Sequence, residues 1–240
     1  MAIRVGTSGW AYAAWKPRFY PPKLPSKDFL KFYSTQLNAV EVNYTFRRFL
    51  TEKVIASWIE QTPASFHFIV KAHQVLTHIK RLRDAEESLK RFLDAIAPLE
   101  QVHRLGPVLF QLPPNFKADA TRLDGFLALV PRASRVAFEF RHESWFEETI
   151  FDVLRRRNAA LCIAETDEFQ TPEVFTADFT YFRLRRSQYS PAARKKIAEA
   201  MSRSATERRD VYAFFKHEEN PDSPNWAREV LLAACPETGS

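Results

Sequence analysis

One short stretch, VAFEFRHESWF at 136–146, places a carboxylate, a guanidinium, an imidazole and an indole close together. Glu139 could act as a general acid or base. Arg141 could grip a carboxylate or phosphate through two parallel hydrogen bonds, while His142 and Trp145 could bind and stack on a polar ligand. The apolar residues before Arg141 alternate with others and are β-branched or aromatic, which predicts a strand that ends there.

Polar or aromatic residues also stand at the ends of other β-rich runs, where a buried strand normally carries few of them. These further candidates are Trp10, Glu41, Asn43, Lys71, His78, Gln111, Arg183 and Arg185. We predict that Glu41, Glu139 and Lys71 are the catalytic residues and that the others bind the ligand. Strand parity places Tyr181, Arg183 and Arg185 on one face, so the arginines could converge with Lys71 on one anion.

These charged residues could also form structural ion pairs and take no part in catalysis. Burial raises the pKa of a carboxylate, whereas a neighbouring arginine or lysine lowers it. If Glu139 lies beside Arg141 or Lys71, it stays ionised and could be only one half of a structural ion pair. The arginines could close similar salt bridges with Glu41, and each tryptophan in the loops could serve packing alone.

The elements that position these residues follow a repeating pattern. Eight β-rich runs span 2–9, 38–44, 66–72, 106–112, 135–140, 160–165, 179–185 and 210–216, and amphipathic helical patterns span 28–37, 51–60, 84–99, 119–130, 147–158 and 223–234. Strands that alternate with helices pair in parallel through right-handed crossovers, and eight of them can close into a barrel. We therefore predict an α/β fold, a single (β/α)8 TIM-type barrel over 1–235, followed by a disordered tail at 236–240.

One connection breaks the pattern. The segment DEFQTPEVFTAD at 167–178 is short and contains Pro172, so we predict an irregular connection between the sixth and seventh strands. A doubly wound open sheet is the alternative fold. It would more often show a glycine-rich first turn, and GTSG at 6–9 is not the GxGxxG pattern.

The composition is that of a soluble globular protein, with 45% hydrophobic and 27% charged residues. The net charge of +6 favours anionic partners without requiring nucleic acid, and the basic clusters at 155–157 and 194–196 fall in separate helical patterns. Cys162 and Cys235 form no CxxC pair, which favours a reducing compartment. With neither a signal peptide nor a membrane-spanning run in the sequence, we expect a cytoplasmic protein without a membrane partner.

A metal site cannot be read from spacing, because the six histidines form no tight ligand motif. A barrel could still assemble a metal site from separate strand ends. The residues available for it are Glu41, Glu139, His142, Glu165, Asp167, His217 and Glu218. We assign no metal ligand and leave the cofactor open.

Several motifs together resemble the DUF72, or YecE-like, family. They are VGTSGWAYAAW, FYPP, NAVEVNYTF, VKAHQVLTH, LGPVLFQLPPNF, EFRHESWF and YFRLRR, and the match spans nearly the whole chain. The resemblance implies a TIM-type barrel and brings no established reaction. The chain departs from the commoner family pattern where the seventh strand continues as R-L-H-G and the eighth ends in F-N-N, because here those ends read RLRRSQYS and FFKHEE.

Our first functional prediction is an enzyme that acts on a small anionic or polyhydroxylated ligand, sugar-like or phosphorylated, at the C-terminal mouth of the barrel. Carboxylate acid and base chemistry would make it a hydrolase or an isomerase of unassigned reaction. A barrel that binds a small ligand without catalysis is one alternative. A protein that binds or processes nucleic acid is the other, and the sequence does not favour it, because its basic clusters form no single stripe. The sequence carries no signal for an oligomeric state.

Overall fold

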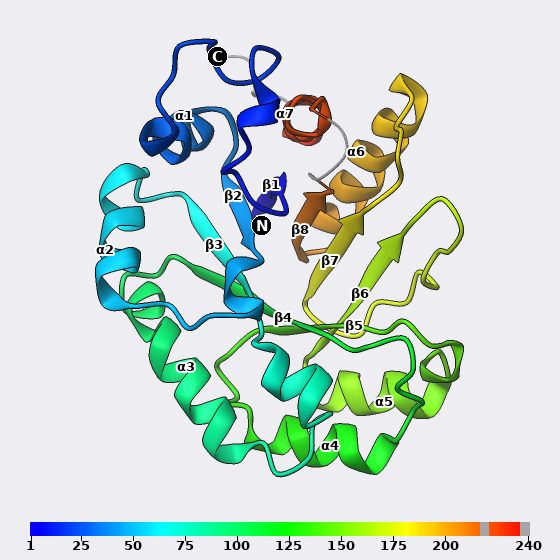
Figure 1. Ribbon diagram of the computed structural model, residues 1–240. Coiled ribbons are helices and arrows are strands. Elements are labelled where there is room, and N and C mark those ends of the chain that lie inside the picture. Colours follow the sequence, from blue (N-terminus) through cyan, green and yellow to red (C-terminus); the bar gives the residue numbers. More distant parts are fainter. Residues whose placement is uncertain (217–220, 236–240) are drawn as a thin grey trace.

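Eight parallel strands alternate with helices in the computed structural model, which describes residues 1–216 and 221–235 (Figure 1). The strands are β1 (Ile3–Thr7), β2 (Ala39–Val42), β3 (His67–Lys71), β4 (Leu105–Gln111), β5 (Val136–Glu139), β6 (Ala160–Glu165), β7 (Phe179–Leu184) and β8 (Asp210–Phe215). The helices are α1 (Phe29–Gln36), α2 (Glu52–Gln61), α3 (Glu86–Gln101), α4 (Ala120–Leu129), α5 (Glu148–Arg156), α6 (Pro191–Thr206) and α7 (Ser223–Ala234). Short helical turns are η1 (Ala13–Trp15), η2 (Ser26–Asp28), η3 (Tyr44–Phe46), η4 (Val75–Ile79) and η5 (Glu143–Trp145).

The strand order is β1-β8-β7-β6-β5-β4-β3-β2, and every pairing is parallel. Each predicted β-rich run overlaps one strand, so the (β/α)8 fold class is confirmed and the open doubly wound sheet is not adopted. The predicted tail at 236–240 lies outside the described residues. None of the described helices is long and apolar enough to cross a lipid bilayer.

The connection between β6 and β7 carries no helix, as predicted. Its residues form a single antiparallel bridge between Glu165 and Gln170, and otherwise run as turn and coil. In Figure 1 the helices surround the strands except between α5 and α6, where this connection passes instead. The outer faces of β6 and β7 are therefore covered by α6 and by irregular chain.

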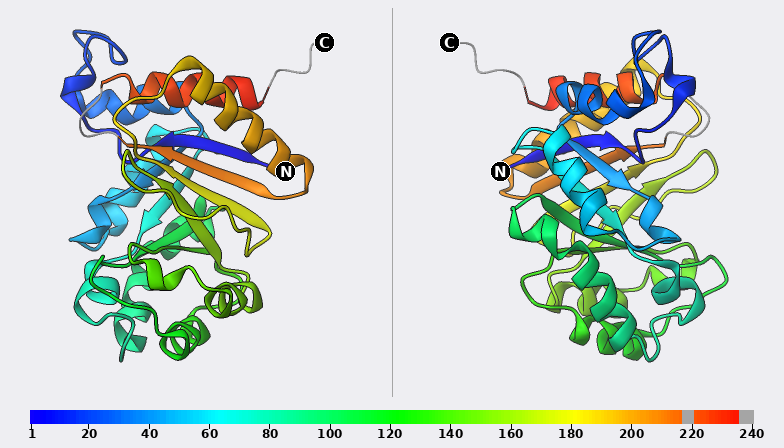
Figure 2. Two further views of the ribbon diagram at one scale, coloured as in Figure 1. Left: turned by 90° about the vertical axis from the view of Figure 1, so that its right-hand side faces the viewer. Right: turned by 60° about the vertical axis from the view of Figure 1, so that its left-hand side comes forward.

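The barrel closes between β1 and β2 through side chains, because these two strands stand at opposite ends of the hydrogen-bonded order. The Asn38 amide accepts from the Val5 N–H at 2.8 Å and donates to the Ile3 carbonyl at 2.8 Å. The amide thus satisfies one donor and one acceptor that a neighbouring strand would normally satisfy. The side view in Figure 2 shows β1 lying against β8 on one side of the barrel.

A tyrosine and a glycine complete this seam. The Tyr33 hydroxyl accepts from the Thr7 N–H at 2.8 Å and donates to the Ala39 carbonyl at 3.1 Å. A Cβ at Gly6 would lie 2.0 Å from that same Ala39 carbonyl oxygen. Gly6 is therefore required for the close approach of β1 to β2.

The interior of the barrel changes from apolar to charged along the strands. On β7 the inward side chains are, in order, Phe179, Tyr181 and Arg183, all of them buried. An inner apolar cluster fills the barrel below the charged layer, with side chains that include Ile69, Leu109, Ala137, Cys162 and Phe214. A second and larger core lies between the strands and the helices. The polar strand ends thus lie above a packed apolar core, and the barrel is not an open pore.

Candidate ligand site at the barrel mouth

Arg183 lies at the centre of the charged layer. Its side chain enters the barrel from β7 with 2% of its surface exposed. One terminal nitrogen contacts Glu41 Oε1 of β2 at 2.6 Å, and the other pairs with Glu139 Oε2 of β5. Between β5 and β7, strand β6 contributes only the small side chains of Cys162 and Ala164, which leaves room for Arg183 and Glu139 to meet.

Glu41 is fully hydrogen-bonded as well as ion-paired. It accepts from Ser8 Oγ at 2.8 Å, from Tyr181 Oη at 2.7 Å and from Asn43 Nδ2 at 3.3 Å. Burial by itself raises the pKa of Glu41, but the Arg183 charge and these hydrogen bonds outweigh it and lower the pKa below its ordinary value. Burial, followed by the Glu41 charge, raises the pKa of Tyr181 well above its ordinary value, so this phenol stays a neutral donor.

Glu139 belongs to the same network. It accepts from Gln111 Nε2 at 2.8 Å and from Arg141 Nε at 3.1 Å. Burial raises the pKa of Glu139, yet the charges of Arg183 and Arg141 hold this pKa well below its usual range. Gln111 in turn accepts from Lys71 Nζ at 2.8 Å, so one chain of contacts joins β2, β3, β4, β5 and β7.

Two cations of this cluster have no carboxylate partner in the described part of the chain. Among the described residues, Lys71 Nζ donates to Gln111 and lies over the face of Phe46, at 4.2 Å from the ring centre. Burial, followed by the Arg183 charge, lowers the pKa of Lys71 to about 8. The guanidinium of Arg185 has no hydrogen bond or ion pair with any described residue, and burial and Arg183 lower its pKa too.

The charge balance of the cluster is positive. The cluster contains four cationic side chains and two carboxylates, and of these described cations only Arg141 and Arg183 form ion pairs with them. In addition, the Nε–H of Arg183 is buried and has no acceptor among the described residues. A buried donor without an acceptor is uncommon in folded proteins, because it forfeits a hydrogen bond that water would have made. The mouth thus presents donors and positive charge for which the described chain supplies no acceptor.

Two other predicted residues lie near this cluster. His78, on η4, packs edge-on against Phe46, and its pKa is lowered by burial and by the charges of Lys71 and Arg141. Trp10 is half-buried at the rim and packs edge-on against Trp58 of α2. The structure thus brings together Glu41, Asn43, Lys71, His78, Gln111, Glu139, Arg141, Arg183 and Arg185.

Trp145 and His142 are engaged in local structure. Trp145 is fully buried, stacks on Phe140 and donates from Nε1 to the Phe116 carbonyl at 2.6 Å. That burial leaves the indole no surface on which a ligand could stack. His142 Nδ1 accepts from the Ser144 N–H at the start of η5, so this ring caps a turn.

The candidate metal ligands are dispersed. In the described ranges, no three histidine, cysteine, aspartate or glutamate side chains are arranged to hold a metal ion. Glu165 pairs with Arg186 at 3.1 Å, and Asp167 accepts from the Ser187 N–H at 3.1 Å. His217 and Glu218 lie outside the described residues.

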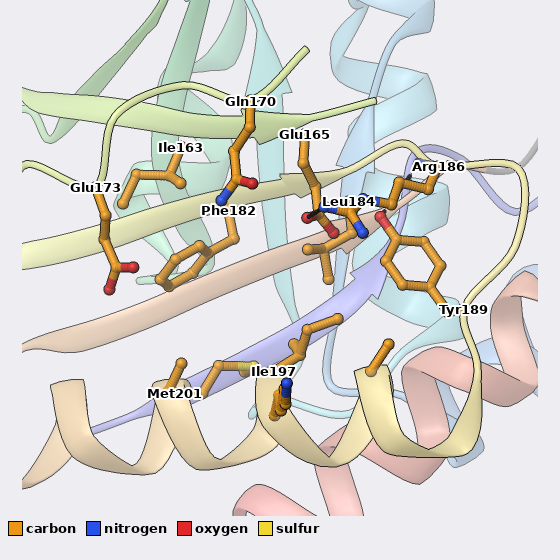
Figure 3. A pocket seen from close by; sticks show the side chains of 13 residues that line it. Ile163, Glu165, Gln170, Glu173, Phe182, Leu184, Arg186, Tyr189, Ile197 and Met201 are labelled. Atoms are coloured by element: carbon orange, nitrogen blue, oxygen red, sulfur yellow. Dashed lines mark hydrogen bonds and ion pairs between the residues drawn. The ribbon is translucent and has the colours of Figure 1, made fainter. Parts of the chain in front are cut away.

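A cavity of about 350 Å³ lies elsewhere, on the outside of the barrel between α6 and β7 (Figure 3). Ile197 and Met201 of α6 point toward Phe182 and Leu184 of β7 across this cavity. It occupies the place where the irregular connection replaces a helix. Its wall is mostly apolar, with Glu165 as the one sequence candidate that lines it.

Three residues of the mouth were not among the predicted site residues. Ser8 and Tyr181 donate to Glu41, and Phe46 covers the Lys71 ammonium. Tyr181 shares strand parity with Arg183, so its inward direction could be read from the sequence. The hydrogen-bond partner of the Tyr181 hydroxyl could not be read from the sequence, because Glu41 is 140 residues away along the chain.

Comparison with known sequences identifies a family whose profile spans nearly the whole chain, and individual relatives that align with part of it. A profile of the family described as protein of unknown function DUF72 matches residues 4–237. The UPF0759 protein YunF of Bacillus subtilis is 30% identical over 156 residues, which cover 62% of this chain and 54% of that protein. The UPF0759 protein YecE of Escherichia coli is 29% identical over 143 residues, 57% of this chain and 52% of that protein. The aligned region thus spans about half the length of these relatives.

Solved structures agree with this comparison. A DUF72 family protein from Thermotoga maritima superposes with a TM-score of 0.81 at 25% identity, covering 96% of this chain and 98% of that one. A family 2 AP endonuclease from Brucella melitensis superposes with a TM-score of 0.56 at 9% identity, covering 97% and 98%. The second likeness shows a shared barrel fold alone.

Proposed function

This chain belongs to the DUF72 family, and we propose that the mouth of its barrel binds a small anion through Lys71, Arg141 and Arg185. The anion is a carboxylate or a phosphate, on a molecule small enough to enter a closed barrel. Guanidinium groups match both anions through paired hydrogen bonds, and lysine adds a compact charge. A hydroxylated ligand, such as a sugar phosphate, belongs to this class.

The observation that carries the proposal is the positive excess inside the barrel. Lys71 and Arg185 have no carboxylate partner among the described residues, although both are at least partly buried beside other cations. Leaving cations close together in a half-buried site is unfavourable unless an anion joins them.

Within this site we assign different roles to the carboxylates and to the lysine. Glu41 and Glu139 are held ionised by Arg183, so they have no proton to donate and are weak bases. They serve as positioning residues that fix Arg183. Lys71, with a pKa of about 8, is the group suited to proton transfer near neutral pH. A hydrolase or isomerase based on the carboxylates is therefore the weaker form of the proposal.

A barrel that binds its anion without catalysis is the second candidate. The observation in its favour is that both carboxylates are paired with one arginine, as in a purely structural network. Both candidate functions use the same anion site. They differ in the role of Lys71, which transfers a proton in the enzyme and only binds the anion in the non-catalytic barrel. Turnover of a small anion that is lost in the Lys71→Arg variant, which keeps the positive charge for anion binding but cannot transfer a proton near pH 8, would favour the enzyme.

Thermal unfolding with added anions tests the binding site. Phosphate, sulfate and malonate, each at matched ionic strength, should raise the melting temperature of the wild type, whereas glucose should not. A ligand at about a hundredfold its Kd stabilises by about 2.7 kcal/mol. The Arg185→Gln variant should lose this response, and Arg156→Gln, on the exposed face of α5, should keep it. An absent response in the wild type, or an equal response in Arg185→Gln, would refute the proposal.

A further inference from the structure

The amine of Lys71 is in the setting that makes a lysine nucleophilic. Its hydrogen-bond partner is the neutral amide of Gln111, and the Phe46 ring covers it at 4.2 Å from the ring centre. An ion pair with a carboxylate would hold the amine protonated, and none exists for Lys71 among the described residues. Removal from water and nearby cations are the two conditions that favour the unprotonated, reactive amine.

The charges that face Lys71 come from several elements. They are Glu41 of β2, His78 of η4, Glu139 of β5, Arg141 just after β5 and Arg183 of β7. The two carboxylates would stabilise the ammonium, but Arg183 holds both of them, and burial and the arginines prevail, so that the pKa of Lys71 falls to about 8. A substantial fraction of the amine is then neutral at mildly alkaline pH.

We propose that Lys71 forms an imine with the carbonyl group of a small anion, a 2-oxo acid or a phosphorylated ketone, held at the mouth by Arg141 and Arg185. This inference rests on the anion site proposed above and adds the reacting group of its ligand. A carbonyl compound without a carboxylate or phosphate cannot form ion pairs with these arginines. The site therefore selects molecules that carry both a carbonyl group and an anionic group.

The neutral amine attacks the carbonyl carbon, a C–N bond forms, the C=O π bond breaks, and a proton moves from nitrogen to oxygen to give a neutral carbinolamine. The carbinolamine oxygen then takes up one proton from the solvent, equal to the proton that the Lys71 ammonium released when it became neutral. The C–O bond breaks, the oxygen leaves as water, and a protonated imine remains. The positive imine withdraws electrons from the neighbouring bonds, which eases the loss of a proton or the breaking of a C–C bond next to it.

Reductive trapping tests the imine directly. The full chain is incubated with pyruvate or with dihydroxyacetone phosphate at about pH 8, close to the pKa of Lys71, and sodium cyanoborohydride is added to reduce any imine to a stable amine. Mass spectrometry of the intact chain and of its peptides should show a single adduct on Lys71. Acetone, which has no anionic group, should give no such adduct. The two probes separate a carboxylate ligand from a phosphate ligand.

Variants provide the controls. Lys71→Arg keeps the positive charge but cannot form the imine, so its adduct should disappear, whereas Lys90→Arg, on the exposed face of α3, should label like the wild type. Peptide mapping of the wild type gives the answer even if Lys71→Arg does not fold. Adducts spread over surface lysines with none on Lys71 would overturn the inference.

The trapping result is separable from the anion site itself. Thermal stabilisation by phosphate is measured on the same preparation. Stabilisation without an adduct on Lys71 would overturn the imine and leave the anion site standing. The absence of both would overturn both proposals.

Discussion

At the scale of single residues, a buried ion-pair network lies inside the barrel. One guanidinium, that of Arg183, forms ion pairs with two carboxylates, Glu41 of β2 and Glu139 of β5. Removing ions from water is costly, and the cost is offset only when every partner is present. Arg183 is therefore expected to matter for folding as much as for ligand binding.

Replacing Arg183 by methionine should destabilise the protein by about 3 to 5 kcal/mol or more, because two buried carboxylates lose their partner. Arg155 provides a matched control, since it also pairs with two carboxylates, Glu148 and Asp152, but on the exposed face of α5. Arg155→Met should cost about 1 kcal/mol or less. Urea unfolding of both variants measures the difference, and equal losses would show that burial does not strengthen the Arg183 network.

The lowered pKa of Glu139 predicts a pH dependence. A carboxylate with a lowered pKa in the folded state contributes stability above its ordinary pKa of 4.5 and loses it as the pH falls toward the folded value. The unfolding free energy of the wild type should therefore drop steeply below about pH 4.5, whereas Glu139→Gln should start lower and drop less steeply. Denaturant titrations between neutral and acid pH compare the slopes. Parallel slopes would mean that Glu139 titrates normally.

At the scale of elements, side-chain hydrogen bonds at the seam between β1 and β2 replace the backbone hydrogen bonds that join the other neighbouring strands. Asn38 bridges the β1 backbone, Tyr33 links it to β2, and Gly6 permits the approach. These three residues hold the first strand against the second. The seam also supports Ser8, which follows β1 and donates to Glu41, so it positions part of the mouth.

Asn38→Ala should destabilise the protein by about 2 to 4 kcal/mol, because one backbone donor and one backbone acceptor of β1 lose their partners. Asn38→Asp should have an intermediate effect, since a carboxylate can accept from the Val5 N–H but cannot donate to the Ile3 carbonyl. Asn115→Ala, which removes an exposed contact to Arg81, serves as the control. A loss for Asn38→Ala no larger than the control would show that the seam is held otherwise.

The elements were largely predictable, and the partners of their side chains were not. Alternating apolar residues indicate each strand and its inward face, and Pro172 marks the connection that lacks a helix. The sequence could not show that Arg183 forms ion pairs with both Glu41 and Glu139, so that Lys71 has no carboxylate partner among the described residues. Those contacts depend on the tilt and closure of the barrel. Trp145 was placed correctly in a loop, but one of the residues that cover it, Phe116, comes from the distant segment after β4.

At the scale of the whole molecule, the net charge is +6, and the basic clusters at 155–157 and 194–196 fall on two separate helices, at the end of α5 and within α6. Many surface arginines are paired with acidic neighbours, among them Arg18 with Asp222 and Arg194 with Glu229. The unpaired positive charge described above lies inside the mouth instead. This distribution suits a small anion better than a long polyanion.

We therefore expect no tight binding of single-stranded or double-stranded oligonucleotides at about 50 mM salt, a concentration at which phosphate contacts are strong. Fluorescence anisotropy with labelled oligonucleotides measures this, and a known nucleic-acid-binding domain confirms that the assay responds. Binding that weakens steeply with added salt would instead favour a nucleic-acid function.

The most direct test of the anion site is a crystal soaked in selenate, whose selenium atom is located by anomalous scattering. Selenate has the charge and shape of sulfate and approximates those of phosphate. We predict a selenium peak in the barrel mouth, with selenate oxygens within hydrogen-bonding distance of Lys71, Arg141 and Arg185. Selenium peaks confined to the outer surface, with the mouth free of selenate at saturating concentration, would contradict it.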